Sequence, residues 1–276
     1  MDLKLLTMNK ENILLLTSTI NPNGMTYTVL QDRNIRQEQY IKAIHFYLAN
    51  TPYKIVFCDN SDIDISEGFL DYIKSGRIEF ITFMGNDFDK TKGKGYGEAK
   101  IILYAIENSK FLKQNCYVTK ITGRIIIRNI CELIQSRVYF LNNIVTCDFC
   151  TDNSIYSIII VSPINWIKKG LEKYIEEIND TNGVYIEHIL YKMLFESQRK
   201  SILGRIIIIP FLKSPKIDGI SGSTGKSYNE IMNKDRFVTD ISYLSSLQWK
   251  KNKMFNFVIL RMLLHLIHLF RKIWNN

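Results

Sequence analysis

The sequence predicts an α/β fold in which helices cover both faces of a mostly parallel central sheet. Short apolar runs alternate with segments of helical periodicity through the first half of the chain. This order is typical of parallel sheets, because a helix must return the chain to the start of the next strand. Runs such as residues 13–16 are apolar at every position, which indicates strands buried on both faces.

The elements are justified by apolar runs, by 3.6-residue periodicity and by turn residues. Strands are predicted at residues 13–16, 54–58, 78–83, 117–122, 144–150, 155–161 and 205–209. Helices are predicted at about 32–49, 66–74, 99–106, 125–134 and 184–197, with another that begins at Ser162 and Pro163. Residues 85–97 and 214–228 are rich in glycine and are predicted to form loops.

One domain, residues 1–235, accounts for these elements, and residues 236–276 form a separate C-terminal segment. With 276 residues, 46% of them hydrophobic, the chain can bury one substantial core. In the C-terminal segment Arg261, His265, His268 and Lys272 recur at helical spacing, and the surrounding positions are mostly apolar. A basic, amphipathic helix of this kind lies in a membrane interface or packs on the protein itself or on a partner subunit.

The charge of the chain predicts an anionic partner. There are 36 Lys and Arg against 27 Asp and Glu, a net charge of +9. Phosphates of a small molecule or an acidic membrane surface fit this charge. Nucleic acid is disfavoured, since the basic residues gather in loops and the tail without a known reader motif. Five cysteines and no secretory signal predict a cytoplasmic protein.

Polar residues follow the first and second predicted strands, at the sheet edge where α/β proteins bind ligands. Thr17 follows the first strand, and Asp59, Asn60 and Asp62 follow the second. A carboxylate at such a strand end can accept hydrogen bonds from a base or ribose. The alternative is an Asx turn that serves the backbone alone.

A glycine- and lysine-rich stretch precedes the helix predicted at residues 99–106. It contains Lys92, Gly93, Lys94, Gly95 and Glu98. Glycines let the backbone approach a ligand closely, and the free N–H groups of the helix start suit a phosphate. The alternative is a solvated loop, and the spacing is not that of a dinucleotide-binding fingerprint.

Two further groups complete the candidate site. Lys120, Gly123 and Arg124 lie at the end of the strand predicted at 117–122. The two cations could neutralise a diphosphate there. The alternative is that they are incidental basic residues of an exposed loop. Glu187 and His188 open a helix, where the carboxylate could act as a general base or simply favour the helix start. Residues 222–227 look like a phosphate-binding loop, but their glycine spacing is wrong.

The order of these segments resembles the GT-A glycosyltransferases, and specifically the bacterial enzymes of capsule and lipopolysaccharide assembly. Residues 17–20 are similar to the first nucleotide-contacting strand of that family, 58–62 to its D-x-S-x-D turn, and 93–106 to its glycine-led helix. Glu187 and His188 resemble the acidic motif that supplies the base in inverting members. The resemblance implies a Rossmann-type nucleotide-binding domain.

The chain departs from this family where the family carries its metal-binding D-x-D motif. Residues 117–124 hold Lys120 and Arg124 there instead. Basic residues are therefore expected to hold the diphosphate, no cofactor is expected beyond the donor, and a divalent metal stays an open question.

The sequence thus predicts an inverting glycosyltransferase that moves a sugar from a nucleoside-diphosphate donor to a glycan or lipid-linked acceptor. It is expected to work in surface polysaccharide biosynthesis, at the inner face of the cell membrane. Two alternatives remain. One is a transferase that uses a phosphoribosyl or nucleotidyl donor, and the other is a non-catalytic module that binds anionic membrane or nucleic acid.

Overall fold

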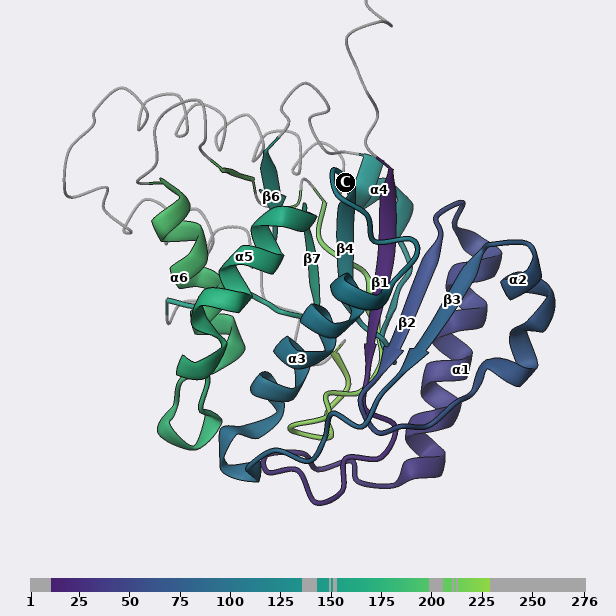
Figure 1. Cartoon of the computed structure of the whole chain (residues 1–276), viewed down its shortest axis with the longest axis horizontal. Helices are drawn as coiled ribbons and strands as arrows, with labels where there is room; N and C mark the ends of the chain where they lie inside the picture. Colours follow the sequence, from purple (N-terminus) through teal and green to yellow (C-terminus); the bar gives the residue numbers. More distant parts are fainter. Residues whose placement is uncertain are drawn as a thin grey trace, which may run out of the picture.

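A computed structural model describes residues 11–135, 143–148, 150, 153–198, 206–209, 211 and 213–228. A seven-stranded sheet lies between two layers of helices (Figure 1). Its order is β3-β2-β1-β4-β7-β6-β8, and within it only the pairs made by β7 are antiparallel. The strands are β1 (Asn12–Ser18), β2 (Ile55–Asp59), β3 (Ile78–Thr82), β4 (Tyr117–Thr122), β6 (Ile144–Thr146), β7 (Ile159–Pro163) and β8 (Ile207–Ile209). The predicted α/β fold with a mostly parallel sheet is confirmed.

Helices cover both faces of this sheet. On the face turned to the viewer in Figure 1 lie α3 (Gly93–Asn108), α5 (Ile164–Tyr174) and α6 (Ile186–Gln198). On the other face lie α1 (Arg33–Asn50) and α4 (Ile130–Gln135). The shorter elements are η2 (Ser66–Phe69), α2 (Leu70–Lys74), η3 (Lys90–Lys92), η4 (Ile175–Glu177), η5 (Asp180–Asn182) and the pair β5 (Ile126–Ile127) and β9 (Ile217–Asp218).

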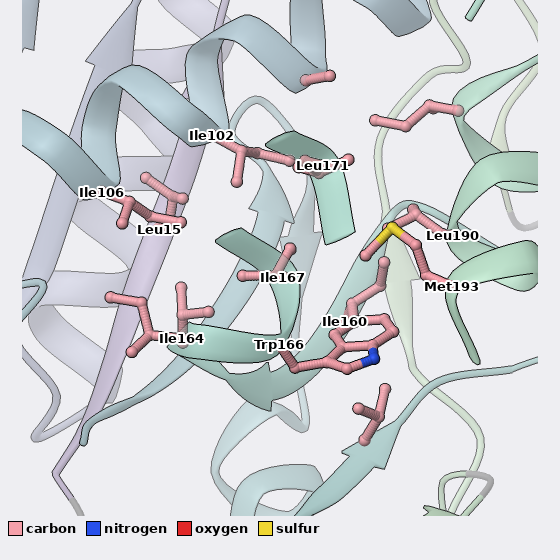
Figure 2. Close-up of a cluster of buried hydrophobic side chains, with 14 of the residues drawn as sticks. Leu15, Ile102, Ile106, Ile160, Ile164, Trp166, Ile167, Leu171, Leu190 and Met193 are labelled. Atoms are coloured by element: carbon pink, nitrogen blue, oxygen red, sulfur yellow. The ribbon is translucent and has the colours of Figure 1, made fainter. Parts of the chain in front are cut away.

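Two apolar clusters hold the layers together, because successive side chains of a strand point to opposite faces. Leu15 of β1 packs with α3, α5 and α6, while Leu14 packs with α1 on the other side. Figure 2 shows the first cluster, where Ile102 of α3, Leu171 of α5 and Met193 of α6 gather beside the sheet. Burying such a side chain stabilises the fold by about 1.5–3 kcal/mol.

Several predicted boundaries are wrong in an informative way. The loop predicted at 85–97 ends early, because α3 already begins at Gly93. The helix predicted from residue 125 begins at Ile130, because Ile126 and Ile127 pair with β9. Ser162 does not cap α5: it stays in β7 opposite Val118, and Pro163 precedes the first turn.

Residues 155–158 precede β7 instead of belonging to it, and β6 ends at Thr146. The predicted C-terminal segment, residues 236–276, lies outside the described residues. In the part of the chain that is described, no helix combines the length and the apolar character needed to cross a membrane.

Candidate active site

A cavity of about 440 Å³ opens at the carboxyl ends of β1, β2 and β4. This volume lies in the usual range for small-molecule sites. Its walls come from these strand ends, from the starts of α3 and α6, and from the segment that leads into β7. Residues 221–224, in the yellow-green chain in the lower half of the molecule in Figure 1, also line it.

Two arginines line the cavity from different elements. Arg36 of α1 is 7% exposed and Arg124, just after β4, is 8% exposed. Arg36 donates to the backbone oxygen of Thr19 at 2.8 Å, and Arg124 to that of Ile220 at 2.5 Å. Within the described residues neither guanidinium has a carboxylate within ion-pair distance. Two buried arginines without acidic partners form a site suited to a phosphate or diphosphate.

The two arginines also influence each other. Burial lowers the pKa of Arg124 from its usual value, and the positive charge of Arg36 lowers it further, while Tyr40, Tyr228 and Glu98 act in the opposite direction. A buried pair of like charges is unfavourable until an anion lies between or beside them. An anion bound beside Arg36 and Arg124 would offset this unfavourable interaction.

Three carboxylates line the same cavity: Glu98 of α3, Asp180 of η5 and Glu187 of α6. The Oε1 atom of Glu187 accepts a 2.6 Å hydrogen bond from the hydroxyl of Ser157, which fixes its orientation. Glu98 accepts a bond of 3.1 Å from the hydroxyl of Thr17. Among the residues described, no three His, Cys, Asp or Glu side chains are grouped so that they could hold a metal ion.

Asp180 lies against the start of α3. It is 2% exposed, its Oδ2 accepts from the backbone nitrogen of Gly95 at 3.2 Å, and its Oδ1 has no hydrogen-bond partner in the described chain. Burial raises the pKa of Asp180. A Cβ atom at Gly93 or Gly95 would collide with this carboxylate. The glycines thus admit the protein's own carboxylate to the helix start, where the sequence predicted a ligand phosphate.

The structure brings half of the predicted site residues to the cavity and places the others elsewhere. Those that line it are Thr17, Asn60, Lys94, Gly95, Glu98, Arg124 and Glu187. Those outside its lining are Asp59, Asp62, Lys92, Gly93, Lys120, Gly123 and His188.

Asp59 lies behind the cavity wall and is fully buried. Its Oδ2 accepts from the hydroxyl of Ser18 at 2.7 Å and from the backbone nitrogen of Ile20 at 2.8 Å. Its Oδ1 accepts from the nitrogen and the hydroxyl of Ser61, at 2.8 and 2.6 Å. The carboxylate that was predicted to hold a nucleoside therefore joins the loops that follow β1 and β2.

Lys120 lies beneath the cavity, with 1% of its side chain exposed, and forms an ion pair with Glu98. Gly123 is needed because its nitrogen donates to the oxygen of Thr17 at 2.9 Å, and a Cβ atom would come within 2.8 Å of the same oxygen. Neither residue presents a group to the cavity, although both shape its floor.

The remaining predicted residues lie outside the cavity lining. Asp62 is exposed, with a φ of 57°. Lys92 forms an ion pair of 3.2 Å with Glu176. His188 accepts, through Nδ1, a bond from the backbone nitrogen of Tyr185 at 3.2 Å.

Sequence reasoning missed Arg36, Tyr40, Ser157 and Asp180. A signal existed for the first two, because Arg36 and Tyr40 share the buried stripe of α1 with Ile44, and an arginine on an apolar stripe needs polar partners. The stretch at 222–227 was set aside as a phosphate loop, yet Ser223 reaches the cavity and bonds to the ammonium of Lys94.

No family model and no curated protein sequence matches the chain. Among solved structures, it is similar to the mannosyltransferase Ktr4p from S. cerevisiae, with 10% identity over 85% of this chain and 82% of that one and a TM-score of 0.47. It is also similar to the inositol-1-phosphate CTP transferase from T. maritima, with 10% identity over 81% and 94% and a TM-score of 0.42. A putative nucleotide-diphospho-sugar transferase from Desulfovibrio desulfuricans G20 is 13% identical over 73% and 80%, with a TM-score of 0.39. These similarities concern the fold and assign no substrate.

Proposed function

We propose that this chain is a glycosyltransferase that moves a sugar from a nucleoside-diphosphate donor to a hydroxyl of a glycan or lipid-linked acceptor. The observation that carries the proposal is one cavity lined by two arginines without acidic partners, Arg36 and Arg124, and by a hydrogen-bonded carboxylate, Glu187. The first pair suits the charge of a diphosphate, and the carboxylate suits a general base.

The donor is expected to lie across the strand ends. Arg36 and Arg124 bind the diphosphate and stabilise the negative charge that grows on it as the bond to the sugar breaks. The nucleoside lies near Thr19 and Asn60, whose side chains are joined by a 2.8 Å hydrogen bond. The side-chain nitrogen Nδ2 of Asn60, which makes no hydrogen bond in the described chain, is available to a base or ribose.

Glu187 is proposed as the base that activates the acceptor. The acceptor hydroxyl gives its proton to Glu187 while its oxygen attacks the anomeric carbon of the sugar. The bond between that carbon and the diphosphate oxygen breaks, the electron pair leaves with the diphosphate, and the configuration at the carbon is inverted. The bond from Ser157 leaves Oε2 of Glu187 to take the proton.

The acceptor and the cellular location are also proposals. A lipid-linked acceptor at the inner face of the cell membrane, in surface polysaccharide biosynthesis, rests on the basic stripe that includes Arg261 and Lys272. These residues lie outside the described part of the chain. Flotation with anionic vesicles tests this location: the full chain should float with them, and a chain without residues 249–276 should not. Equal flotation of both chains would remove the tail from this role.

Thermal unfolding with UDP, GDP, CMP, dTDP or phosphoribosyl diphosphate, each with and without Mn²⁺, tests the function. A nucleoside diphosphate at 100 times its Kd should stabilise the protein by about 2.7 kcal/mol. The shift should be lost in Arg124→Gln and kept in Lys192→Gln, a control whose lysine pairs with Glu177 away from the cavity.

Release of the nucleoside diphosphate from the matching sugar donor then tests transfer directly. A shift with phosphoribosyl diphosphate alone would favour the phosphoribosyl alternative. No shift with any of the five ligands would contradict the transferase proposal and favour a binding module.

A further inference from the structure

A buried ion pair lies beneath the floor of the cavity. The ammonium of Lys120 contacts Oε1 of Glu98, donates to the backbone oxygen of Ser157 at 2.5 Å, and makes a longer contact of 3.5 Å with the hydroxyl of Thr122. An ammonium group has three protons, and each is directed at a partner within the protein. Lys120 therefore has no proton left for a phosphate in the cavity.

Glu98 is held on one side and open on the other. Its Oε1 accepts from Lys120 and from the hydroxyl of Thr17. Its Oε2 makes no hydrogen bond within the described residues, although Glu98 lines the cavity and its side chain is 18% exposed. The result is a carboxylate of fixed orientation with one free oxygen at the cavity.

The same lysine reaches the second carboxylate through Ser157. The backbone oxygen of Ser157 accepts from Lys120, and its hydroxyl donates to Glu187 at 2.6 Å. Glu98 and Glu187 come from different helices, α3 and α6, so their relative position depends on the segment that Lys120 holds. One buried cation thus organises two carboxylates of the cavity.

Stability alone gives no reason for this arrangement. Removing a lysine from water carries a desolvation penalty that its ion pair often fails to offset, and apolar pairs of similar volume are often equally stable or more stable. Apolar residues surround the ion pair, since Val118 and Leu15 belong to the same buried cluster as the apolar side chains of α3. The ion pair is therefore better explained by the orientation of Glu98 and Glu187 than by a contribution to the stability of the fold.

We propose that Lys120 is a positioning residue, and that Glu98, which it fixes, accepts a hydrogen bond from a sugar hydroxyl of the bound substrate through Oε2. This inference rests on the proposed function, and it replaces the predicted contact between Lys120 and the diphosphate. The hydroxyl belongs either to the ribose of the nucleotide or to the transferred sugar. A hydrogen bond of a hydroxyl to a charged acceptor accounts for about a tenfold gain in affinity.

Calorimetric titration of the full chain separates these roles. The proteins are the wild type, Lys120→Met, the double variant Glu98→Gln/Lys120→Met and Arg124→Gln. The ligands are inorganic pyrophosphate, UDP, GDP, UDP-glucose and GDP-mannose. Lys120→Met and the double variant should bind pyrophosphate within about twofold of the wild type, and bind the ligand that carries the recognised hydroxyl about tenfold more weakly. Arg124→Gln should weaken pyrophosphate itself.

The ligands identify the hydroxyl. A loss already seen with UDP or GDP assigns it to the ribose, and a loss seen only with the sugar nucleotide assigns it to the transferred sugar. Either result supports the inference. It is overturned if Lys120→Met weakens pyrophosphate as much as Arg124→Gln does, because Lys120 then contacts the anion. It is also overturned if Lys120→Met binds every ligand as the wild type does.

Folding is checked by thermal unfolding of each variant. Methionine matches the length of the lysine stem, and the double variant removes both charges together, so one of the two is expected to fold. If neither folds, the pair is structural and the inference fails. If the wild type binds none of the ligands, the proposed function fails and the inference fails with it, a result distinct from equal binding by wild type and Lys120→Met.

Discussion

The hydroxyl of Ser18 donates a 2.7 Å hydrogen bond to Oδ2 of Asp59, and this bond joins the carboxyl ends of β1 and β2 beside the cavity. The same oxygen accepts from the backbone nitrogen of Ile20, while Oδ1 accepts from Ser61. A fully buried carboxylate with this many donors fixes the two loops from which Thr19 and Asn60 reach the cavity. Asp59 is therefore expected to influence a bound ligand only through the positions of Thr19 and Asn60.

Asp59→Ala is therefore expected to destabilise the fold by about 2–4 kcal/mol, because several buried donors lose their acceptor. Urea unfolding measures this change. The matched control is Glu67→Gln, which removes an exposed carboxylate from η2 and should change stability by less than about 0.5 kcal/mol. If Asp59→Ala is as stable as the wild type but no longer binds nucleotide, the direct contact predicted from the sequence holds instead.

Glu187→Gln should lower kcat by about 100-fold or more and leave the affinity for the donor unchanged, because glutamine fills the same space without accepting a proton. Initial rates of nucleoside-diphosphate release at saturating donor measure this. His188→Gln is the control, since His188 lies outside the cavity lining and should lose less than about threefold. Full activity of Glu187→Gln would remove this residue as the base.

Gly123→Ala should destabilise the protein by about 1–3 kcal/mol, because the added Cβ atom would lie 2.8 Å from the backbone oxygen of Thr17. The displaced strand end should also weaken nucleotide binding. Gly68→Ala is the matched control, because a Cβ atom there meets nothing within 4 Å. The unfolding midpoints of the two variants measure the difference in stability. Equal midpoints would show that the backbone around Thr17 can move to accommodate the added Cβ atom.

Asp180→Asn should make the protein more stable at pH 7. Burial raises the pKa of Asp180, so the folded state holds this proton more tightly than the unfolded state does. Stability from this group is thus greatest at low pH, and it falls as the pH rises from about 4 through the raised pKa. Asparagine is neutral, so it avoids the cost of a buried charge, and its oxygen can still accept the hydrogen bond from the backbone nitrogen of Gly95.

The gain is expected to be present at pH 7 and to shrink toward pH 4. Urea unfolding of both proteins between pH 4 and pH 8 checks it. A difference that stays constant with pH would show that the hydrogen bonds of Asp180, and not its charge, are responsible.

The sequence predicted β1 to β4 well, because short runs rich in apolar, β-branched and aromatic residues end at polar or glycine residues. It predicted α1 because Ile41, Ile44 and Leu48 recur at helical spacing. It could not tell Lys120 from Arg124, since both are basic residues at one strand end. The difference lies in the alternation of the strand: Lys120 stands inside β4, on the same side as Val118, and faces the buried layer below α3. A buried lysine needs a partner, and only the structure shows that this partner is Glu98.

Asp180 and Ser157 could not be found in the same way. Each belongs to a short irregular segment whose place depends on how α5 and α6 pack, and no local pattern encodes that packing. Arg36 did carry a signal, its place on the buried stripe of α1, but that signal did not show that the residue lines the cavity. It lies on the first helix, far from any predicted strand end, and only the curve of the chain through Thr19 brings it to the cavity.

The place of β1 in the sheet has a consequence for how the chain folds during synthesis. β1 pairs with β4 in a register that sets Asn12 opposite Tyr117 and Thr17 opposite Thr122. A growing chain can therefore form β1, β2 and β3 early, but one edge of β1 stays open until the region around Thr122 has emerged. An apolar strand edge that waits for a partner about 100 residues away invites pairing with other chains. Expression of fragments that end before β4 should therefore give aggregates. Fragments that include β4 can form the pair of β1 and β4 and should aggregate less.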